Sequence, residues 1–107
     1  MNRNGIKEKD LTPALAWLNG EINDAEFLRR EIALNGTSQD IVRGYIESTN
    51  NLLSIDPRCK KKFRLDLLWQ NRQISNAEFI RGYMDLGVSE MIAEAELYTL
   101  RTGKSAE

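Results

Sequence analysis

Apolar residues along the chain recur three and four positions apart, which is the spacing that places them on one face of an α-helix. The clearest runs are Ile41, Val42, Tyr45, Ile46, Leu52 and Leu53 in the first half, and Phe79, Ile80, Tyr83 and Met84 in the second. No segment of six or more residues reads as alternating β-branched or aromatic positions, so strands have little support. The pattern predicts an all-α protein.

Polar residues mark where two of these helices begin. Asn23 lies three residues before Glu26, and Ser75 lies three residues before Glu78. This is the spacing of a capping box, in which the first side chain accepts from a backbone N–H in the first helical turn while the glutamate accepts from the backbone N–H of the capping residue. We therefore expect a capping box at the start of both helices.

Further start and stop signals complete a set of six predicted helices, three in each half of the chain. Starts are predicted at Asp10 or Thr12 with Pro13 at the first helical position, at Ser38 and Ser89, and at Asp56 before Pro57; stops are predicted at Asn19-Gly20, Asn35-Gly36 and Gly87. Short loops between consecutive helices favour antiparallel neighbours.

The two halves of the chain repeat one another. Residues 17–34 and 69–86 are identical at eight of eighteen positions, at a constant offset of 52. Beyond them the offset falls to 51, which aligns Gly36 with Gly87. Self-similarity at a fixed period is the signature of a repeated structural unit. The sequence predicts a compact six-helix protein made of two tandem three-helix repeats.

These repeats define the expected organisation of the chain. The two units span about residues 5–52 and 57–103, and together they form a single domain that comprises residues 1–107. A length of 107 residues suits one modest hydrophobic core. Residues 104–107 are expected to form a flexible tail.

Composition removes several classes of function. Apolar residues make up 41% and charged residues 29% of the chain, and the net charge is −1, which is typical of a water-soluble globular protein. The chain has no histidine, so it lacks the usual general base and the commonest metal ligand. Its single cysteine, Cys59, excludes an internal disulfide and a cysteine-based zinc site within one chain. We expect a non-enzymatic protein with no metal and no cofactor.

The location follows from the absence of targeting signals. The first ten residues contain no apolar segment of the kind found in a signal peptide, and nowhere do about 18 apolar residues run together as a membrane helix requires. We expect a cytoplasmic protein without membrane contact.

One dense run of basic residues lies where the fourth predicted helix begins. It consists of Arg58, Lys60, Lys61, Lys62 and Arg64. Cationic side chains at a helix start could grip a phosphate backbone. Against this, the whole chain has a pI near 5.6 and lacks the basic footprint of a dedicated nucleic-acid-binding protein. A solvated helical face explains the run as well. Cys59, within the run, is either a reactive thiolate or a packed apolar side chain.

Two other features occur once in each half. Trp17 and Trp69 occupy equivalent positions, either as core residues or as anchors for a partner, because tryptophan is common among interface hot spots. The tripeptide Arg-Gly-Tyr occurs as Arg43-Gly44-Tyr45 and as Arg81-Gly82-Tyr83. Glycine inside a helix costs about 1 kcal/mol relative to alanine, so it indicates close approach either of another helix of the chain or of a partner helix.

Together these features favour a protein–protein interaction module, such as an adaptor or a small inhibitor that occupies a surface of a larger protein or complex. The candidate partner-binding residues are Trp17, Arg43, Tyr45, Trp69, Arg81 and Tyr83. The alternative is a nucleic-acid-binding regulator that uses the basic helix starting at Arg58. We expect a monomer or a homodimer.

Overall fold

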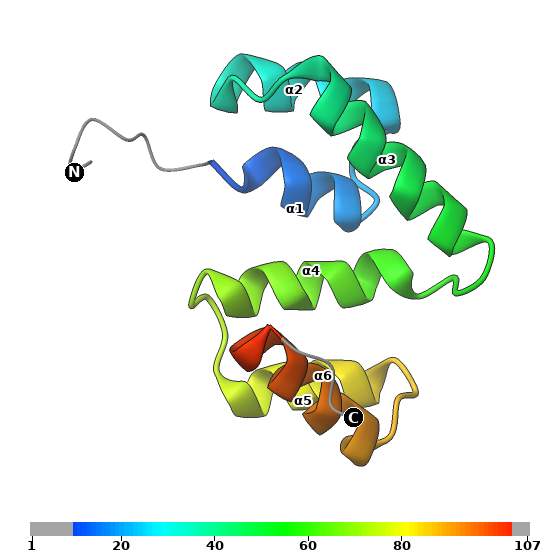
Figure 1. The fold of residues 1–107 in the computed structure, drawn as a ribbon, viewed down its shortest axis with the longest axis vertical. Helices are drawn as coiled ribbons and strands as arrows, with labels where there is room; N and C mark the ends of the chain where they lie inside the picture. The colour runs from blue at the N-terminus through cyan, green and yellow to red at the C-terminus, as the bar shows by residue number, and fades with distance from the viewer. Residues whose placement is uncertain (1–9, 104–107) are drawn as a thin grey trace. The chain divides into compact units, whose positions relative to one another are not determined.

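The computed structural model describes residues 10–103, and within this range the chain forms six α-helices and no strand (Figure 1). The all-α prediction is thereby confirmed for the described residues. The chain divides between Asp56 and Pro57 into two compact units, which we call the first and the second unit. Each unit contains three consecutive helices. The predicted tail at 104–107 lies outside the described residues.

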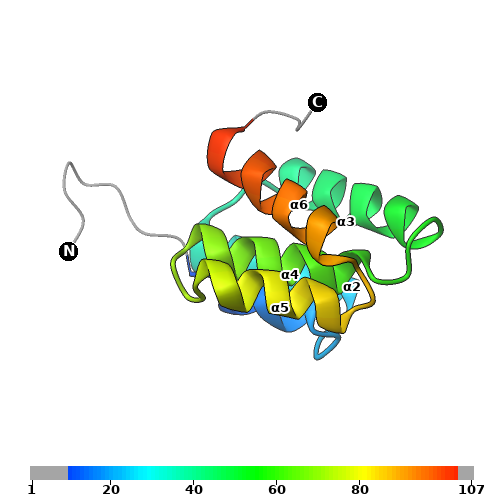
Figure 2. The same ribbon diagram turned by 90° about the horizontal axis from the view of Figure 1, so that it is seen from below.

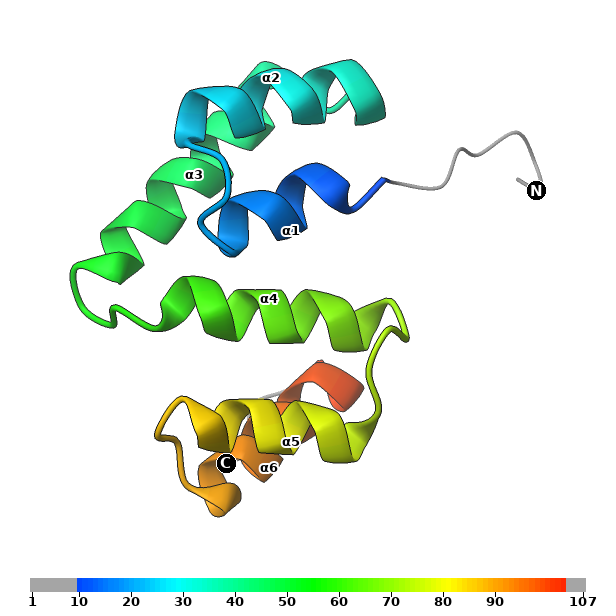
Figure 3. The same ribbon diagram turned by 180° about the vertical axis from the view of Figure 1, so that it is seen from behind.

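The first unit is built by α1 (Thr12–Leu18), α2 (Asp24–Asn35) and α3 (Gln39–Leu53). Helix α1 packs on α2, and α2 packs on α3. Figures 1 and 3 show that α1 and α2 run in opposite directions after the turn that joins them, and that α3 crosses α2 obliquely.

The second unit is built by α4 (Cys59–Gln70), α5 (Asn76–Asp85) and α6 (Glu90–Thr102). Helix α4 packs on α5, and α5 packs on α6. In Figure 2, α4 and α5 lie antiparallel and α6 crosses them. The order of packing is therefore the same in both units.

The predicted N-caps are confirmed at four of the six helices. The side chains of Asn23 and Ser75 accept hydrogen bonds from the backbone N–H groups of Glu26 and Glu78, at 2.8 Å and 3.1 Å. Ser38 and Ser89 cap α3 and α6 in the same way, each over 3.3 Å. These bonds satisfy N–H groups that have no partner within the helix.

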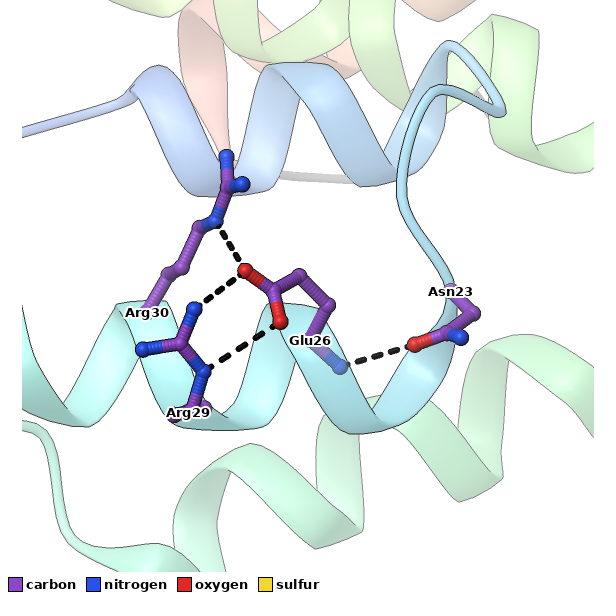
Figure 4. Close-up of polar contacts among 4 residues, drawn as sticks. All are labelled: Asn23, Glu26, Arg29 and Arg30. Atoms are coloured by element: carbon purple, nitrogen blue, oxygen red, sulfur yellow. Dashed lines mark hydrogen bonds and ion pairs between the residues drawn. The ribbon is translucent and has the colours of Figure 1, made fainter.

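The capping box is complete only in the second unit. There the Glu78 carboxylate accepts from the backbone N–H of Ser75 at 2.8 Å. In the first unit Glu26 turns instead toward Arg29 and Arg30, as Figure 4 shows, and it binds both guanidinium groups. The capping box predicted for the first unit was thus wrong, because α2 offers Glu26 two cations one turn away while α5 has glycine at position 82.

Helices α1 and α4 begin differently from the prediction. The N-cap of α1 is Leu11, whose side chain makes no capping bond, while Asp10 accepts from the backbone N–H of Thr12 at 2.9 Å. Asp56 is not the N-cap residue of α4: Pro57 and Arg58 form a turn, so α4 begins at Cys59, and its N-cap residue is Arg58, whose side chain makes no capping bond. In α1, by contrast, the predicted residue Asp10 does accept a hydrogen bond at the helix start, although it precedes the N-cap residue Leu11.

A left-handed residue ends the first helix of each unit. Gly20 has a φ of 79°, as predicted, whereas the corresponding residue of the second unit is Arg72 with a φ of 60°. A side chain disfavours this conformation, so the turn after α4 carries strain that the turn after α1 avoids. The backbone bonds around the two turns are otherwise alike, because Glu21 donates to Ala16 and Gln73 donates to Leu68.

The core of the first unit forms around Trp17, which is completely buried. Its ring stacks on Phe27, with 4.6 Å between the centroids and 8° between the planes. Its indole N–H donates to the Asp24 carboxylate at 2.8 Å, and the other carboxylate oxygen of Asp24 accepts from Asn50 at 2.9 Å. One tryptophan thereby joins α1 to α2, while Asp24 joins α2 to α3.

The core of the second unit contains the buried residues Phe79, Tyr83, Val88, Ala93 and Leu97. Trp69 packs against this cluster while remaining half-buried, with 6.2 Å between its ring and that of Phe79. Its indole N–H donates to Asn76 at 2.7 Å. Of the two alternatives, Trp17 is therefore a core residue, whereas Trp69 is only partly covered.

A carboxylate is buried near the end of α2 in the first unit. Glu31 accepts from the side chains of Asn35 and Thr37, at 3.0 Å and 2.9 Å. In residues 10–103 every fully buried side-chain nitrogen or oxygen atom has a hydrogen-bond partner. These neutral donors offset part of the cost of burying Glu31.

None of the helices in the described range combines the length and the hydropathy that a bilayer crossing requires.

The caps lead to a stability prediction. Replacing Ser75 by alanine removes the oxygen that binds the Glu78 N–H, so the free energy of unfolding should fall by about 1 kcal/mol. Asn23→Ala should have a similar effect on the first unit. Chemical denaturation measures both, and Ser48→Ala, an exposed change inside α3, is the control that removes no cap. An unchanged midpoint and slope for Ser75→Ala would show that Ser75 does not cap α5.

Candidate partner-binding surface

One exposed strip of helix α3 stands out in the first unit. Ile41 is 65% exposed, Tyr45 40% and Leu52 42%. Because successive residues of an α-helix are rotated by about 100°, these three side chains fall within about 40° of one another. Gly44 and Ser48 lie beside them. We call these five residues, Ile41, Gly44, Tyr45, Ser48 and Leu52, the α3 stripe.

The α3 stripe borders the face of α3 that packs in the first unit, and Tyr45 lies at this border, with its ring 5.6 Å from that of Trp17. Val42 and Thr49 are buried, and Ile46 and Leu53 are half-buried on the same side. The apolar and small residues of α3, from Gly44 round to Ile46, therefore extend over about 200° of the helix, of which the unit covers only about half. The amphipathic pattern in the sequence correctly identified a wide apolar face, but not that half of it faces outward.

The two Arg-Gly-Tyr tripeptides have different environments. A Cβ atom at Gly82 would lie 2.6 Å from Cδ2 of Leu65, so α4 approaches α5 closely at this glycine. A Cβ atom at Gly44 would meet nothing within 4 Å. Close approach within the chain thus explains Gly82, and no packing contact in the described structure explains Gly44.

The candidate residues of the first unit fall on different sides of their helices. Trp17 is buried against Phe27, so its ring offers no exposed surface. Tyr45 lies partly in the α3 stripe and partly against the core, with its ring 5.6 Å from that of Trp17. Arg43 is exposed but lies on the polar side of α3. Of these three residues only Tyr45 belongs to the stripe.

The candidate residues of the second unit do not form one surface. Trp69 is half-buried, Tyr83 is buried, and Arg81 is exposed on α5. Arg81 lines an open hollow of about 440 Å³ with Ala77, Ile80, Met84, Asp85 and Glu90. It forms no salt bridge within the described range, in contrast to Arg29, its counterpart in the first unit.

A larger hollow, of about 680 Å³, lies at the turn between α4 and α5. It is lined by Trp69, Gln70, Arg72, Gln73, Ile74, Ser75, Asn76 and Glu78. The Ser75 N–H and the Trp69 indole N–H, two donors at this turn, are already bound by Glu78 and Asn76. The hollow therefore follows from the shape of the strained turn and holds no convergent set of groups for chemistry.

The basic run does not act as a set. Arg58 donates from Nη1 to the backbone carbonyl of Leu86 at 2.9 Å, so this guanidinium ties the start of α4 to the end of α5. Lys61 is exposed, whereas Lys60, Lys62 and Arg64 are half-buried. Consecutive helical positions point these charges in different directions. Cys59 is buried, and within residues 10–103 no group of histidine, cysteine or acidic side chains is arranged to hold a metal.

The charged residues Glu26, Arg29 and Arg30 on α2 bind one another. The bonds from Arg29 and Arg30 lower the pKa of Glu26 (Figure 4). Both arginines and the glutamate lie at the surface, where such pairs contribute little stability. A carboxylate that is held ionised by two cations is a poor general base, so the cluster orders the exposed side of α2 and offers no catalytic group.

Asp66 is a half-buried acid that the sequence analysis missed. The hydroxyl of Tyr83 donates to its carboxylate at 2.7 Å, linking α4 to α5. Burial raises the pKa of Asp66 to about 6; the Tyr83 hydrogen bond and Lys62 oppose this rise, and Glu96 on α6 adds to it. The available signal was an aspartate inside the apolar run from Phe63 to Trp69.

Helix α6 also exposes apolar side chains that were not predicted as site residues. Met91, Ile92 and Tyr98 are all exposed, and Ile92 is 61% exposed. Ile92 follows its capping serine by three residues, as Ile41 does in α3. Met91 and Tyr98 lie about 20° apart on α6, whereas Ile92 lies about 100° from Met91, so only two of the three exposed residues share a strip.

Comparison with known proteins identifies no relative: no family model, no curated protein and no solved structure matches this chain.

The two Arg-Gly-Tyr glycines give a matched pair of variants. Gly44→Ala should raise the free energy of unfolding by about 0.5–1 kcal/mol, because alanine favours helix and its methyl group meets open space. Gly82→Ala should not show this gain, because Leu65 must move away from the new methyl group. Denaturation of both variants measures the difference, and equal stabilisation by the two changes would contradict the close approach of Leu65.

Asp66 leads to a prediction for pH. Its pKa of about 6 in the folded protein exceeds the ordinary value of 3.8, so the folded state holds this proton more tightly. The contribution of the protonated Asp66 to the free energy of unfolding is therefore fully present below about pH 3.8 and is lost as the pH rises through about 6. An asparagine side chain at this position would remain neutral and still accept from Tyr83.

Asp66→Asn should thus raise the free energy of unfolding at pH 7.5 by about 1 kcal/mol, after allowance for solvent screening, and leave it nearly unchanged at pH 4. Denaturation at a series of pH values tests this, with the exposed Asp85→Asn as the control. A gain of equal size at pH 4 and pH 7.5 would show that the effect does not come from ionisation.

Proposed function

We propose that this chain is a non-enzymatic protein–protein interaction module, an adaptor or small inhibitor that occupies a surface of a larger protein in the cytoplasm. The α3 stripe is its contact surface. The chain would meet its partner as a monomer or a homodimer, without a metal or cofactor.

The observation that carries this proposal is the α3 stripe itself. Three apolar side chains on one strip of the helix are 40–65% exposed, although the same helix has an adjacent face that is well buried. Exposed apolar groups that gather on one face are typical of interaction sites, whereas single exposed apolar residues are ordinary. Gly44, at the edge of the strip beside Asp40 and Glu47, weakens the helix by about 1 kcal/mol without serving any internal contact.

We also propose that the two units are copies of one ancestral repeat that have diverged in role. The support is a pair of equivalent hydrogen bonds, from Trp17 to Asp24 and from Trp69 to Asn76. The two donors are 52 positions apart in the sequence, and so are the two acceptors. Gly82 supports packing inside the second unit, whereas Gly44 remains open. In this interpretation the second unit serves stability and the first unit provides the contact surface.

The nucleic-acid alternative gains no support from the basic run. Arg58 is bound to a backbone carbonyl, and the neighbouring cations point to several sides of α4. A binder that grips a phosphate backbone gains affinity from each neutralised phosphate, so cations that cannot face one groove together contribute little. Nucleic acid therefore becomes an outcome of the following test.

The test compares a blocked stripe with a matched control on the full chain. Gly44→Arg places a bulky charged side chain in the α3 stripe, whereas Gln39→Arg adds the same side chain about 140° around the helix. Each tagged variant is incubated with nuclease-treated and untreated lysate, and the retained proteins are quantified. Circular dichroism and thermal unfolding confirm that both variants fold.

We expect the wild type and Gln39→Arg to retain the same protein, and Gly44→Arg to lose at least about nine-tenths of it, because an interface core does not tolerate the steric clash of a bulky side chain. Nuclease should make no difference. If Gly44→Arg retained the same proteins as the wild type, the stripe would not be the contact surface. If nuclease abolished retention, the nucleic-acid alternative would replace the proposal.

A further inference from the structure

The α3 stripe has features that indicate the kind of partner it fits. Resting on the proposed function above, we infer that its occupant is a basic amphipathic helix of another protein, which lies along α3 with its apolar side on Ile41, Tyr45 and Leu52 and its backbone close to Gly44.

The spacing and the size of the stripe residues favour a helical partner. They occur at positions 41, 44, 45, 48 and 52, the three- and four-residue spacing by which one helix contacts another along its length. α3 has 15 residues, so a helix of similar length can lie along it. Gly44 and Ser48 are the smallest residues of the strip, and the open space over Gly44 leaves room for a second backbone. An extended peptide would not use the space over Gly44, because extended peptides bind through backbone groups at a sheet edge or in an aromatic-lined groove.

The charges beside the stripe indicate that the partner is basic. One edge of the stripe adjoins the buried face of the unit, and the other adjoins Asp40 and Glu47, which lie about 40° and 60° around the helix from Gly44. Arg43 lies about 40° beyond Glu47, so this edge carries two acids and one base. Both acids are exposed, and neither forms an ion pair within residues 10–103. A partner helix seated on the stripe would place its own flanking residues beside them. Lysine or arginine at those flanks complements the acids, whereas glutamate would be repelled.

A second copy of α3 does not supply this chemistry. The helix contains no lysine, and its single arginine, Arg43, lies about 100° around the helix from Gly44. Two α3 stripes packed together would bring two uncharged strips into contact with four carboxylates and only two arginines at their edges, which leaves a net negative charge. The acidic edge therefore favours a partner of opposite charge over self-association.

Synthetic helical peptides of defined composition test this inference. The first peptide has about 18 residues, enough to match the length of α3, with leucine and alanine on one face and lysine on both flanks. The second has glutamate in place of each lysine, and the third contains the residues of the first in an order that breaks the amphipathic pattern. Each carries a fluorescent label, and anisotropy reports its binding to the full chain at low salt and at about 0.5 M salt, where charge interactions are strongly screened.

The lysine peptide should bind at least about tenfold more tightly than the glutamate peptide and than the scrambled peptide, with weaker binding at high salt. Gly44→Arg should abolish this binding, and Gln39→Arg should leave it unchanged. The double variant Asp40→Asn, Glu47→Gln should weaken it about three- to tenfold and reduce its salt dependence. That double variant leaves every stripe residue unchanged, and circular dichroism checks its fold, so it isolates the contribution of the acidic edge.

Each other outcome overturns the inference. Equal binding of the lysine and glutamate peptides would show that charge does not select the partner. Equal binding of the scrambled and lysine peptides would show that charge attracts the peptide without an amphipathic helix packing on the stripe. Failure of every peptide to bind would exclude a basic helix as occupant. A dimer in sedimentation that is lost in Gly44→Arg would identify a second copy instead. In all four cases the capture experiment with Gly44→Arg still decides separately whether the stripe is a contact surface.

Discussion

The arrangement of each unit depends on one contact, made by the tryptophan at the end of its first helix. Trp17 donates its indole N–H to Asp24, and Trp69 donates to Asn76, in both cases to the beginning of the next helix seven residues on. The same rings pack on Phe27 and Phe79, which lie one turn further along those helices. A single side chain thus fixes both the direction and the depth of the turn, and aromatic pairs of this kind add about 0.5–1.5 kcal/mol beyond the area they bury.

The two units differ in how they join their helices beyond this contact. In the first, Asp24 accepts both from Trp17 and from Asn50, so one carboxylate holds three helices together. In the second, Tyr83 contributes a ring to the core and a hydroxyl to Asp66, which ties α5 to α4. The position of Tyr83 corresponds to that of Glu31 in the first unit, where a carboxylate is buried among neutral donors. The exchange of an aromatic for an acid explains why the second core is the more apolar one.

Much of the fold could be predicted from the sequence because the signals that start and stop helices are local. Ser38, Ser75 and Ser89 each satisfy a backbone N–H three residues ahead, and this requirement does not depend on the rest of the chain. The failures occurred where two partners compete for one group. Glu26 has the spacing of a capping box, but its carboxylate binds Arg29 and Arg30. Residue spacing alone does not show whether a carboxylate will bind the backbone N–H of the capping residue or a nearby guanidinium group. At the turn after α4 the expected residue is missing: the backbone is left-handed at Arg72, where glycine would be favoured.

The candidate surface was harder to predict, because a sequence pattern shows which residues share a face but not how much of that face its neighbours cover. Ile41 and Val42 look alike in the sequence, yet one is exposed and the other is buried. The same holds for the two glycines of the Arg-Gly-Tyr tripeptides, which are distinguished only by the position of Leu65. A helix that folds against a single neighbour can bury about half of its circumference, and an apolar face wider than that must leave a strip in water. The strip on α3 is therefore the part of its wide apolar face that α1 and α2 leave exposed.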